Sequence, residues 1–190
     1  MMLKNELEFD ESTHTYNIGD RKLISVTQGI SILDTRWRDP WYLTRGKYIH
    51  KATELYDRDE LDEDRLDPQI RPYLDAYVKF KEDTGFLVRL IEHKLFHPQH
   101  KYAGRIDRTG ILNGVEDLID IKSGTKVDTD ELQGAGYWGL CKSNNIPIRK
   151  IFGLYLKENG TYSLVEVKNP KSLLPVFLAA LTLTRWKNRL

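Results

Sequence analysis

The chain has 190 residues, with 29 Lys and Arg against 28 Asp and Glu, which gives a formal net charge of +1. Its single cysteine, Cys141, excludes an internal disulfide, a four-cysteine zinc site and an iron–sulfur cluster built by one chain. No apolar run approaches the roughly 18 residues of a membrane span, and the N-terminus lacks a signal-peptide layout. We therefore expect one cytoplasmic domain over 1–190, without a membrane partner.

The first part of the sequence predicts a hairpin followed by helices. The expected elements, in chain order, are a β-hairpin over 7–24, a short helix over 25–33, a helix over 41–56 and a helix over 67–85. Gly19-Asp20 suits the hairpin turn. Pro40 and Pro68 suit first helical turns, and Gly85 suits a helix end.

An acidic run separates the last two of these helices. Residues 57–67 hold seven acids and two arginines, so this segment carries −5 and the rest of the chain +6. The run lacks the glycine at position six and the glutamate at position twelve of a calcium loop. We expect a solvated loop here, and a basic remainder suited to a polyanionic partner.

The second half alternates in the manner of strands. We expect strands over 87–96, 102–112, 115–122, 148–156 and 161–167, with helices over 129–144 and 170–190. This order indicates a mixed α/β domain, in which helices flank a mixed β-sheet that follows an N-terminal β-hairpin. Its expected parts are the hairpin and helix (1–35), a helical part (36–85), a sheet with one helix (86–168) and a C-terminal helix (169–190).

One predicted hairpin brings two carboxylates together. Asn113-Gly114 is a strong signal for a two-residue turn. That turn places Asp107 opposite Asp120 and Arg105 opposite Lys122, all on one face. The other face then carries apolar residues for a core: Ile106, Leu112, Val115, Ile119 and Ile121. A bulge at Gly110 would shift this register.

Two opposed aspartates repel each other at a Cβ separation of about 5 Å. A divalent cation between Asp107 and Asp120 removes that penalty, and hard cations prefer carboxylate oxygen. Lys122 would then project beside the cation, where an ammonium can orient water or offset phosphate charge. The alternative is an exposed polar hairpin face with unpaired charges, and the hairpin alone leaves both interpretations open. Glu116 and Asp117, near the turn, are expected to be solvated.

Five short motifs occur in the order typical of one nuclease family. They are Gly46-Lys-Tyr-Ile-His50, Glu92, Gly104-Arg-Ile-Asp107, Asp120-Ile-Lys122 and Gln133-Gly-Ala-Gly-Tyr137. In this order they resemble the RecB-like branch of the PD-(D/E)xK nuclease superfamily. The N-terminal hairpin followed by Ser25-Val-Thr27 is similar to small phage and mitochondrial-genome-maintenance exonucleases of that branch. The resemblance covers about residues 8–160.

The resemblance implies a PD-(D/E)xK core and a role for each motif residue. It implies metal ligands in His50, Asp107, Asp120 and the Ile121 carbonyl. Lys122 would be the catalytic lysine, while Gln133 and Tyr137 would border the active site and touch nucleic acid. Each has a plainer alternative: His50 as a buried structural histidine, and Tyr137 as ordinary packing. Glu92 is either a further carboxylate ligand or part of a surface ion pair with Lys94.

By this resemblance the protein is a metal-dependent deoxyribonuclease, acting as an exonuclease in DNA recombination, repair or phage DNA processing. It implies Mg²⁺, with Mn²⁺ able to substitute because a histidine ligand tolerates the softer ion, and no iron–sulfur cluster. The implied partners are DNA with a single-stranded segment or free end, and a recombination or replication protein. Two rival hypotheses are a catalytically inactive DNA-binding module and a metal-dependent hydrolase of another phosphoester.

Basic and aromatic residues also interleave around the start of the helix that carries His50. They occur as Arg36-Trp37-Arg38, Trp41-Tyr42 and Arg45-Gly46-Lys47-Tyr48. This mixture suits single-stranded nucleic acid, since rings stack on bases and cations meet phosphates. It equally suits an amphipathic helix whose aromatic side faces a core, and the sequence does not decide between the two.

Overall fold

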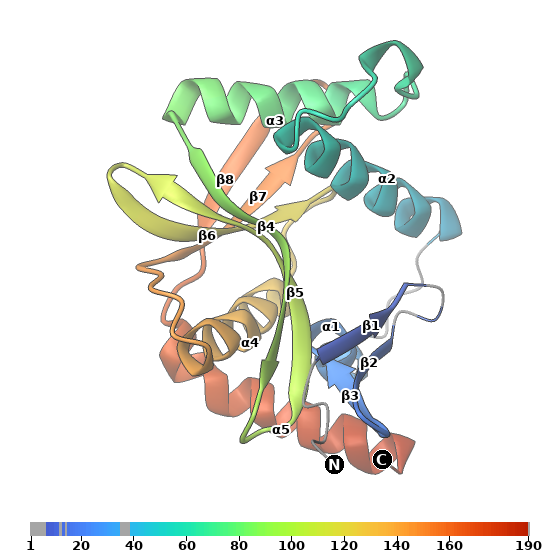
Figure 1. Cartoon of the computed structure of the whole chain (residues 1–190), viewed down its shortest axis with the longest axis vertical. Coiled ribbons are helices and arrows are strands. Elements are labelled where there is room, and N and C mark those ends of the chain that lie inside the picture. Colours follow the sequence, from blue (N-terminus) through green and yellow to red (C-terminus); the bar gives the residue numbers. More distant parts are fainter. Residues whose placement is uncertain (1–6, 12, 14, 35–38, 190) are drawn as a thin grey trace.

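In the computed structural model, which describes residues 7–11, 13, 15–34 and 39–189, one mixed sheet runs through the molecule (Figure 1). The order is β1-β2-β3-β5-β6-β7-β8, and β4 pairs with β5 outside this path. β3–β5 and β6–β7 are parallel, and the other pairs are antiparallel. The strands are β1 (Leu7–Asp10), β2 (Thr15–Ile18), β3 (Arg21–Ser25), β4 (Leu87–His97), β5 (Tyr102–Leu112), β6 (Val115–Lys122), β7 (Ile151–Leu156) and β8 (Tyr162–Glu166).

Helices cover both faces of the sheet (Figure 1). They are α1 (Val26–Ile30), α2 (Pro40–Asp57), α3 (Arg71–Thr84), α4 (Asp128–Ser143) and α5 (Pro170–Asn188), with short 3-10 turns η1 (Ser31–Leu33) and η2 (Glu63–Arg65). One apolar core, which includes Leu140 and Phe177, lies beneath α1, α4 and α5. A second core, which includes Ile49 and Phe80, lies beneath α2 and α3. The predicted mixed α/β class, with a sheet flanked by helices, is confirmed.

Local signals account for most element boundaries. Ser25 caps α1 through a reciprocal pair of hydrogen bonds with Gln28, and Asp39 caps α2. Gly85, at φ +63°, ends α3 in the left-handed region. The predicted hairpin over 7–24 is in fact three strands, β1 to β3. Arg36-Trp37-Arg38 lies outside the described residues.

The start of α3 differs from the prediction. The helix begins at Arg71, because the Asp67 carboxylate accepts the Gln69 N–H at 2.8 Å and closes a separate turn first. The acidic run before it is exposed at six of its acids, as predicted. Asp57 is the exception: it is the last residue of α2, and its side chain is fully buried.

The β5–β6 hairpin corrects two further expectations. Asp117 is fully buried rather than solvated, because its carboxylate accepts from Arg149 Nε at 3.1 Å and from the Lys150 N–H at 2.9 Å. Val115 is 41% exposed and does not join a core, because it lies at the hairpin tip. Among the described residues, no helix is long and apolar enough to span a membrane.

Candidate active site

The β5–β6 turn sets the register of the two strands that carry Asp107 and Asp120. Asn113 and Gly114 have φ +52° and +79°, the left-handed values of a tight hairpin turn. The strands pair in the predicted register from the turn to Arg108 opposite Ile119, with no shift at Gly110. The ladder ends there, one position before Asp107 and Asp120.

Beyond that pair, the Asp107 side chain takes the place of a backbone acceptor in the β5–β6 ladder. Asp107 Oδ2 accepts the Ile121 N–H at 2.7 Å, and Asp107 and Asp120 are both buried. Burial raises the pKa of Asp107 to about 7; the nearby Glu92 and Asp120 act in the same direction, while His50 opposes them. The protein thus keeps the Asp107 carboxyl group in a buried site where its charged form is disfavoured.

His50 and Glu92 complete a cluster around Asp107. His50 Nδ1 lies 3.5 Å from Asp107 Oδ1 and 3.8 Å from Glu92 Oε1. One ligand atom of each of the three residues lies within 4.8 Å of the others. Burial lowers the pKa of His50, but the Asp107 and Glu92 carboxylates outweigh it and raise the pKa. The cluster offers one imidazole nitrogen and two carboxylate oxygens from α2, β4 and β5, a donor set that fits a divalent cation.

Glu92 reaches this cluster through an unusual backbone. Its φ is +48°, and the β4–β5 ladder pairs the residues on either side of it but skips Glu92 itself. Arg105 Nε and Arg108 Nη1 donate to its carboxylate at 2.8 and 2.9 Å. Glu92 is therefore buried among arginines, while Lys94 lies over the Phe9 ring. The alternative of a surface ion pair between Glu92 and Lys94 is therefore not the arrangement found.

Lys122 lies on the other side of the two aspartates. Its Nζ is 2.8 Å from Asp120 Oδ2 and donates to Gln133 Oε1 at 2.7 Å. Gln133 Nε2 in turn donates to the Tyr137 hydroxyl at 3.1 Å, so Gln133 and Tyr137 on α4 continue the chain from Lys122. Burial lowers the pKa of Lys122, but Asp120 and Asp130 outweigh it and raise the pKa, so the ammonium keeps its proton.

Comparison with known proteins shows which solved structures have a similar fold. The described chain is similar to a solved protein from Eubacterium rectale described as a candidate exonuclease, with a TM-score of 0.55, 11% identity and coverage of 85% of this chain and 77% of that chain. An alkaline exonuclease from Laribacter hongkongensis gives a TM-score of 0.43 and 12% identity over 88% of this chain and 92% of its own. No family model and no curated protein matches the sequence. At this identity, the first likeness establishes the fold alone.

Sequence reasoning missed a buried network behind the cluster. Arg108 is fully buried and donates from Nε to Asp57 Oδ2 at 2.6 Å, and from Nη1 to Glu92 and to the Asp107 carbonyl. Its Nη2 donates to Thr53 at 3.3 Å, so one guanidinium joins the helix of His50 to β4 and β5. The only signal in the sequence was the position of Arg108 directly after Asp107.

Tyr16 was missed as well. This residue of β2 is buried, and its hydroxyl lies within electrostatic reach of the site. Burial raises the pKa of Tyr16 to about 12; Arg105 opposes this rise, and Glu92 and Asp107 add to it. The N-terminal strands therefore contribute a side chain to the surroundings of the cluster.

Proposed function

We propose that this protein is a metal-dependent exodeoxyribonuclease of the RecB-like branch of the PD-(D/E)xK superfamily, hydrolysing DNA phosphodiester bonds. The observation that carries the proposal is the convergence of His50, Glu92 and Asp107 within 4.8 Å, beside an Asp120–Lys122 pair. A metal-dependent nuclease needs a cation site and a fixed positive donor next to it, and these two groups would supply both. The exonuclease fold of the first structural neighbour agrees with this assignment.

His50, Glu92 and Asp107 would hold the cation, and Asp120 and the Ile121 carbonyl would join them as the family resemblance implies. Bound there, Mg²⁺ or Mn²⁺ would polarise a phosphoryl oxygen and lower the pKa of water. Lys122 would keep its proton, because Asp120 and Asp130 hold its pKa up, and would present an ammonium to the charge that develops on phosphate. Gln133 would fix the direction of that ammonium through its 2.7 Å hydrogen bond.

The test uses end-labelled single- and double-stranded DNA, with Mg²⁺ or with EDTA. We expect cleavage with Mg²⁺ only, and loss of it in Asp107→Ala/Asp120→Ala. Asp128→Ala removes an exposed carboxylate at the start of α4 and serves as the matched control, which should cleave like wild type. A circular strand of the same sequence should survive, because an exonuclease needs an end.

The same assay separates the rival functions. An inactive DNA-binding module would retain the labelled strand without cleaving it under any metal condition. A hydrolase of another phosphoester would cleave bis(p-nitrophenyl) phosphate and leave DNA intact. Cleavage by the double variant at the wild-type rate would remove the two aspartates from the reaction.

A further inference from the structure

The first turns of α2 expose aromatic rings on the face that is buried further along the helix. Ile49 and Ala52 of α2 lie in the core. Residues seven apart share a helix face, so Tyr42 lies on the stripe of Ile49, and Arg45 lies one turn after Tyr42, while Trp41 and Tyr48, also seven apart, share the next stripe around the helix. Yet Trp41, Tyr42 and Tyr48 are 37%, 55% and 54% exposed. In Figure 1 the start of α2 lies at the edge of the molecule, away from the helices that cover the sheet.

Exposed apolar side chains are concentrated in this part of the sequence. Five of the ten large apolar side chains that stand exposed among the described residues fall between positions 33 and 48: Leu33, Trp41, Tyr42, Leu43 and Tyr48. Exposed apolar side chains gathered in one region mark an interaction site more often than a bare surface. The exposure of Trp41, Tyr42 and Tyr48 also argues against the alternative that these rings face a core.

Arg45 adds an uncompensated positive charge to the same face. Its guanidinium carbon lies 4.7 Å from the Tyr42 ring centroid and 5.1 Å from that of Tyr73, and Nη2 donates to the Ser123 carbonyl at 2.9 Å. Among the described residues no carboxylate pairs with Arg45, and its Nε is buried without a partner. By contrast, Lys51 and Arg58, the cations further along α2 and at its C-terminal end, pair with Glu54.

This surface adjoins the candidate active site. Ser123, which accepts from Arg45, directly follows Lys122. Arg45 precedes His50 by five residues and Tyr42 precedes it by eight, which corresponds to about 7.5 and 12 Å along the helix axis. Because Arg45 and His50 point about 140° apart around the helix, the Arg45–Ser123 hydrogen bond beside Lys122 is what joins this face to the cluster, and a strand bound at the cluster would reach the rings by that side.

We propose that this face of α2 binds a single-stranded DNA segment next to the catalytic cluster, with Trp41, Tyr42 and Tyr48 stacking on bases and Arg45 contacting phosphate. Exposed rings beside an unpaired cation fit a chain that carries both flat bases and negative charge. Duplex DNA fits less well, because its bases are stacked within the helix and offer no free face. The inference rests on the proposed nuclease function and adds to it the form of the substrate.

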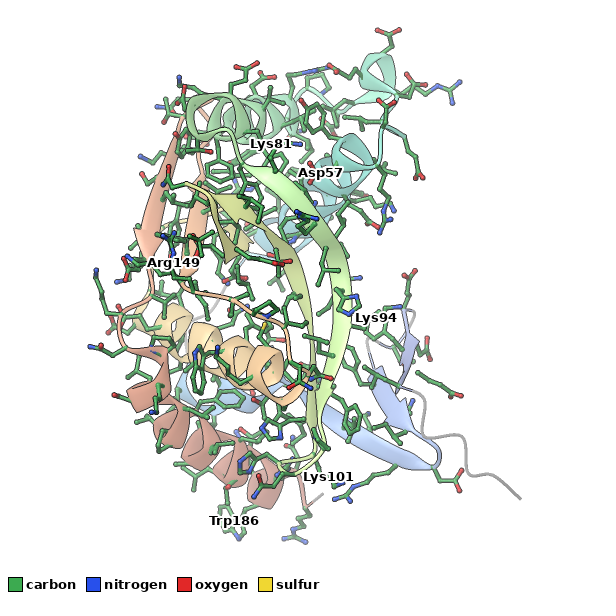
Figure 2. All side chains as sticks on the ribbon, turned by 60° about the vertical axis from the view of Figure 1, so that its left-hand side comes forward. Asp57, Lys81, Lys94, Lys101, Arg149 and Trp186 are labelled. Atoms are coloured by element: carbon green, nitrogen blue, oxygen red, sulfur yellow. The ribbon has the colours of Figure 1, made fainter. Side chains whose placement is uncertain are left out.

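The test separates stacking from charge by using two labelled probes of equal length, oligo(dT) and an abasic strand. Binding is measured by fluorescence anisotropy with Ca²⁺ in place of Mg²⁺. Tyr42→Ala and Tyr48→Ala should each weaken oligo(dT) binding about fivefold or more and leave abasic binding unchanged. Trp186→Ala is the matched control, since this residue of α5 is 78% exposed and lies at the far end of the molecule (Figure 2).

A second pair of variants tests the charge. Arg45→Ala should weaken binding of both probes and reduce the dependence of log affinity on log salt by about 0.7. Lys187→Ala removes an exposed cation of α5, next to the control residue Trp186, so binding should be unchanged.

The inference is overturned if the two tyrosine variants bind oligo(dT) like wild type, or lose oligo(dT) and abasic binding equally. It is also overturned if these variants change only self-association, measured by sedimentation, because the face would then be an interface between copies. In each of these cases cleavage by wild type leaves the nuclease proposal standing. Wild-type protein that neither binds nor cleaves DNA refutes both proposals.

Discussion

Arg108→Met tests whether the buried guanidinium holds the candidate site together. Arg108 is fully buried and joins Asp57 at the end of α2 to Glu92 on β4. Methionine has similar length and no charge, so the substitution removes the interactions with little change in volume. It leaves two buried carboxylates without their shared cation.

The expected cost follows from what each carboxylate retains. Removing one partner of a buried ion pair typically costs about 3–5 kcal/mol. Here Asp57 keeps Lys81 Nζ and the Tyr77 hydroxyl, both at 2.6 Å, and Glu92 keeps Arg105 Nε at 2.8 Å. We therefore expect the lower end, about 3 kcal/mol, or a fall in Tm of about 6–12 °C for a domain of this size. Because domains are stable by about 5–15 kcal/mol, the variant should still fold.

Urea denaturation gives the change in unfolding free energy, provided that the slope against urea stays constant. Lys81→Met is the comparison variant, because Lys81 contacts the same Asp57 but is 26% exposed, and it should cost about 1 kcal/mol or less. A loss below about 1 kcal/mol for Arg108→Met, or a loss equal to that of Lys81→Met, would refute the reasoning.

Three further outcomes concern the site itself. Lys122→Ala should lower the rate of DNA cleavage about 10²- to 10³-fold, measured at a temperature where the variant is folded, because it removes a preorganised donor; a rate within a few fold of wild type contradicts this role. His50→Ala should raise the midpoint of a Mn²⁺ titration of cleavage tenfold or more, whereas a structural histidine would lower Tm and leave that midpoint unchanged. Tyr137→Phe removes the hydroxyl that accepts from Gln133 at 3.1 Å, so it should slow cleavage more than it lowers Tm; the reverse order indicates ordinary packing.

The fold was predictable where neighbouring residues decide it. Ser25 and Asp39 cap helices through contacts within three residues, and Asn113-Gly114 sets the β5–β6 register by its own backbone preference. Asp57 and Asp117 were wrongly predicted to be in solvent, because residues far away in the sequence decide their burial. Charged side chains are exposed unless paired, and their partners, Arg108 and Arg149, lie 51 and 32 residues away.

In the candidate site, too, the sequence predicted what neighbouring residues decide and missed what distant residues decide. The hairpin turn set the β5–β6 register as far as Arg108 opposite Ile119, the positions next to Asp107 and Asp120, and Lys122 lies beside Asp120, two residues earlier on β6. The approach of His50 required the packing of α2 against β4, which no local pattern contains; only the family resemblance pointed to it. The left-handed backbone conformation of Glu92 could not be predicted from the sequence, because a glutamate within a strand is expected to have a negative φ.

That left-handed position yields a prediction about strain. Within a strand, glycine is ordinarily about 0.5–1 kcal/mol less stable than alanine. At φ +48° a Cβ costs about 1–2 kcal/mol, and glycine avoids this cost. Glu92→Gly and Glu92→Ala lose the same contacts with Arg105 and Arg108, so their difference isolates the backbone.

We expect Glu92→Gly to be more stable than Glu92→Ala by about 1 kcal/mol in urea denaturation, the reverse of the usual strand order. The same comparison at Lys94, a strand position without positive φ, should give the usual order and serves as the control. If alanine is the more stable residue at both positions, β4 does not hold Glu92 in a strained conformation. If the order reverses at Glu92 alone, the protein keeps a strained backbone in order to turn this carboxylate toward His50 and Asp107, which is the expected cost of a preorganised site.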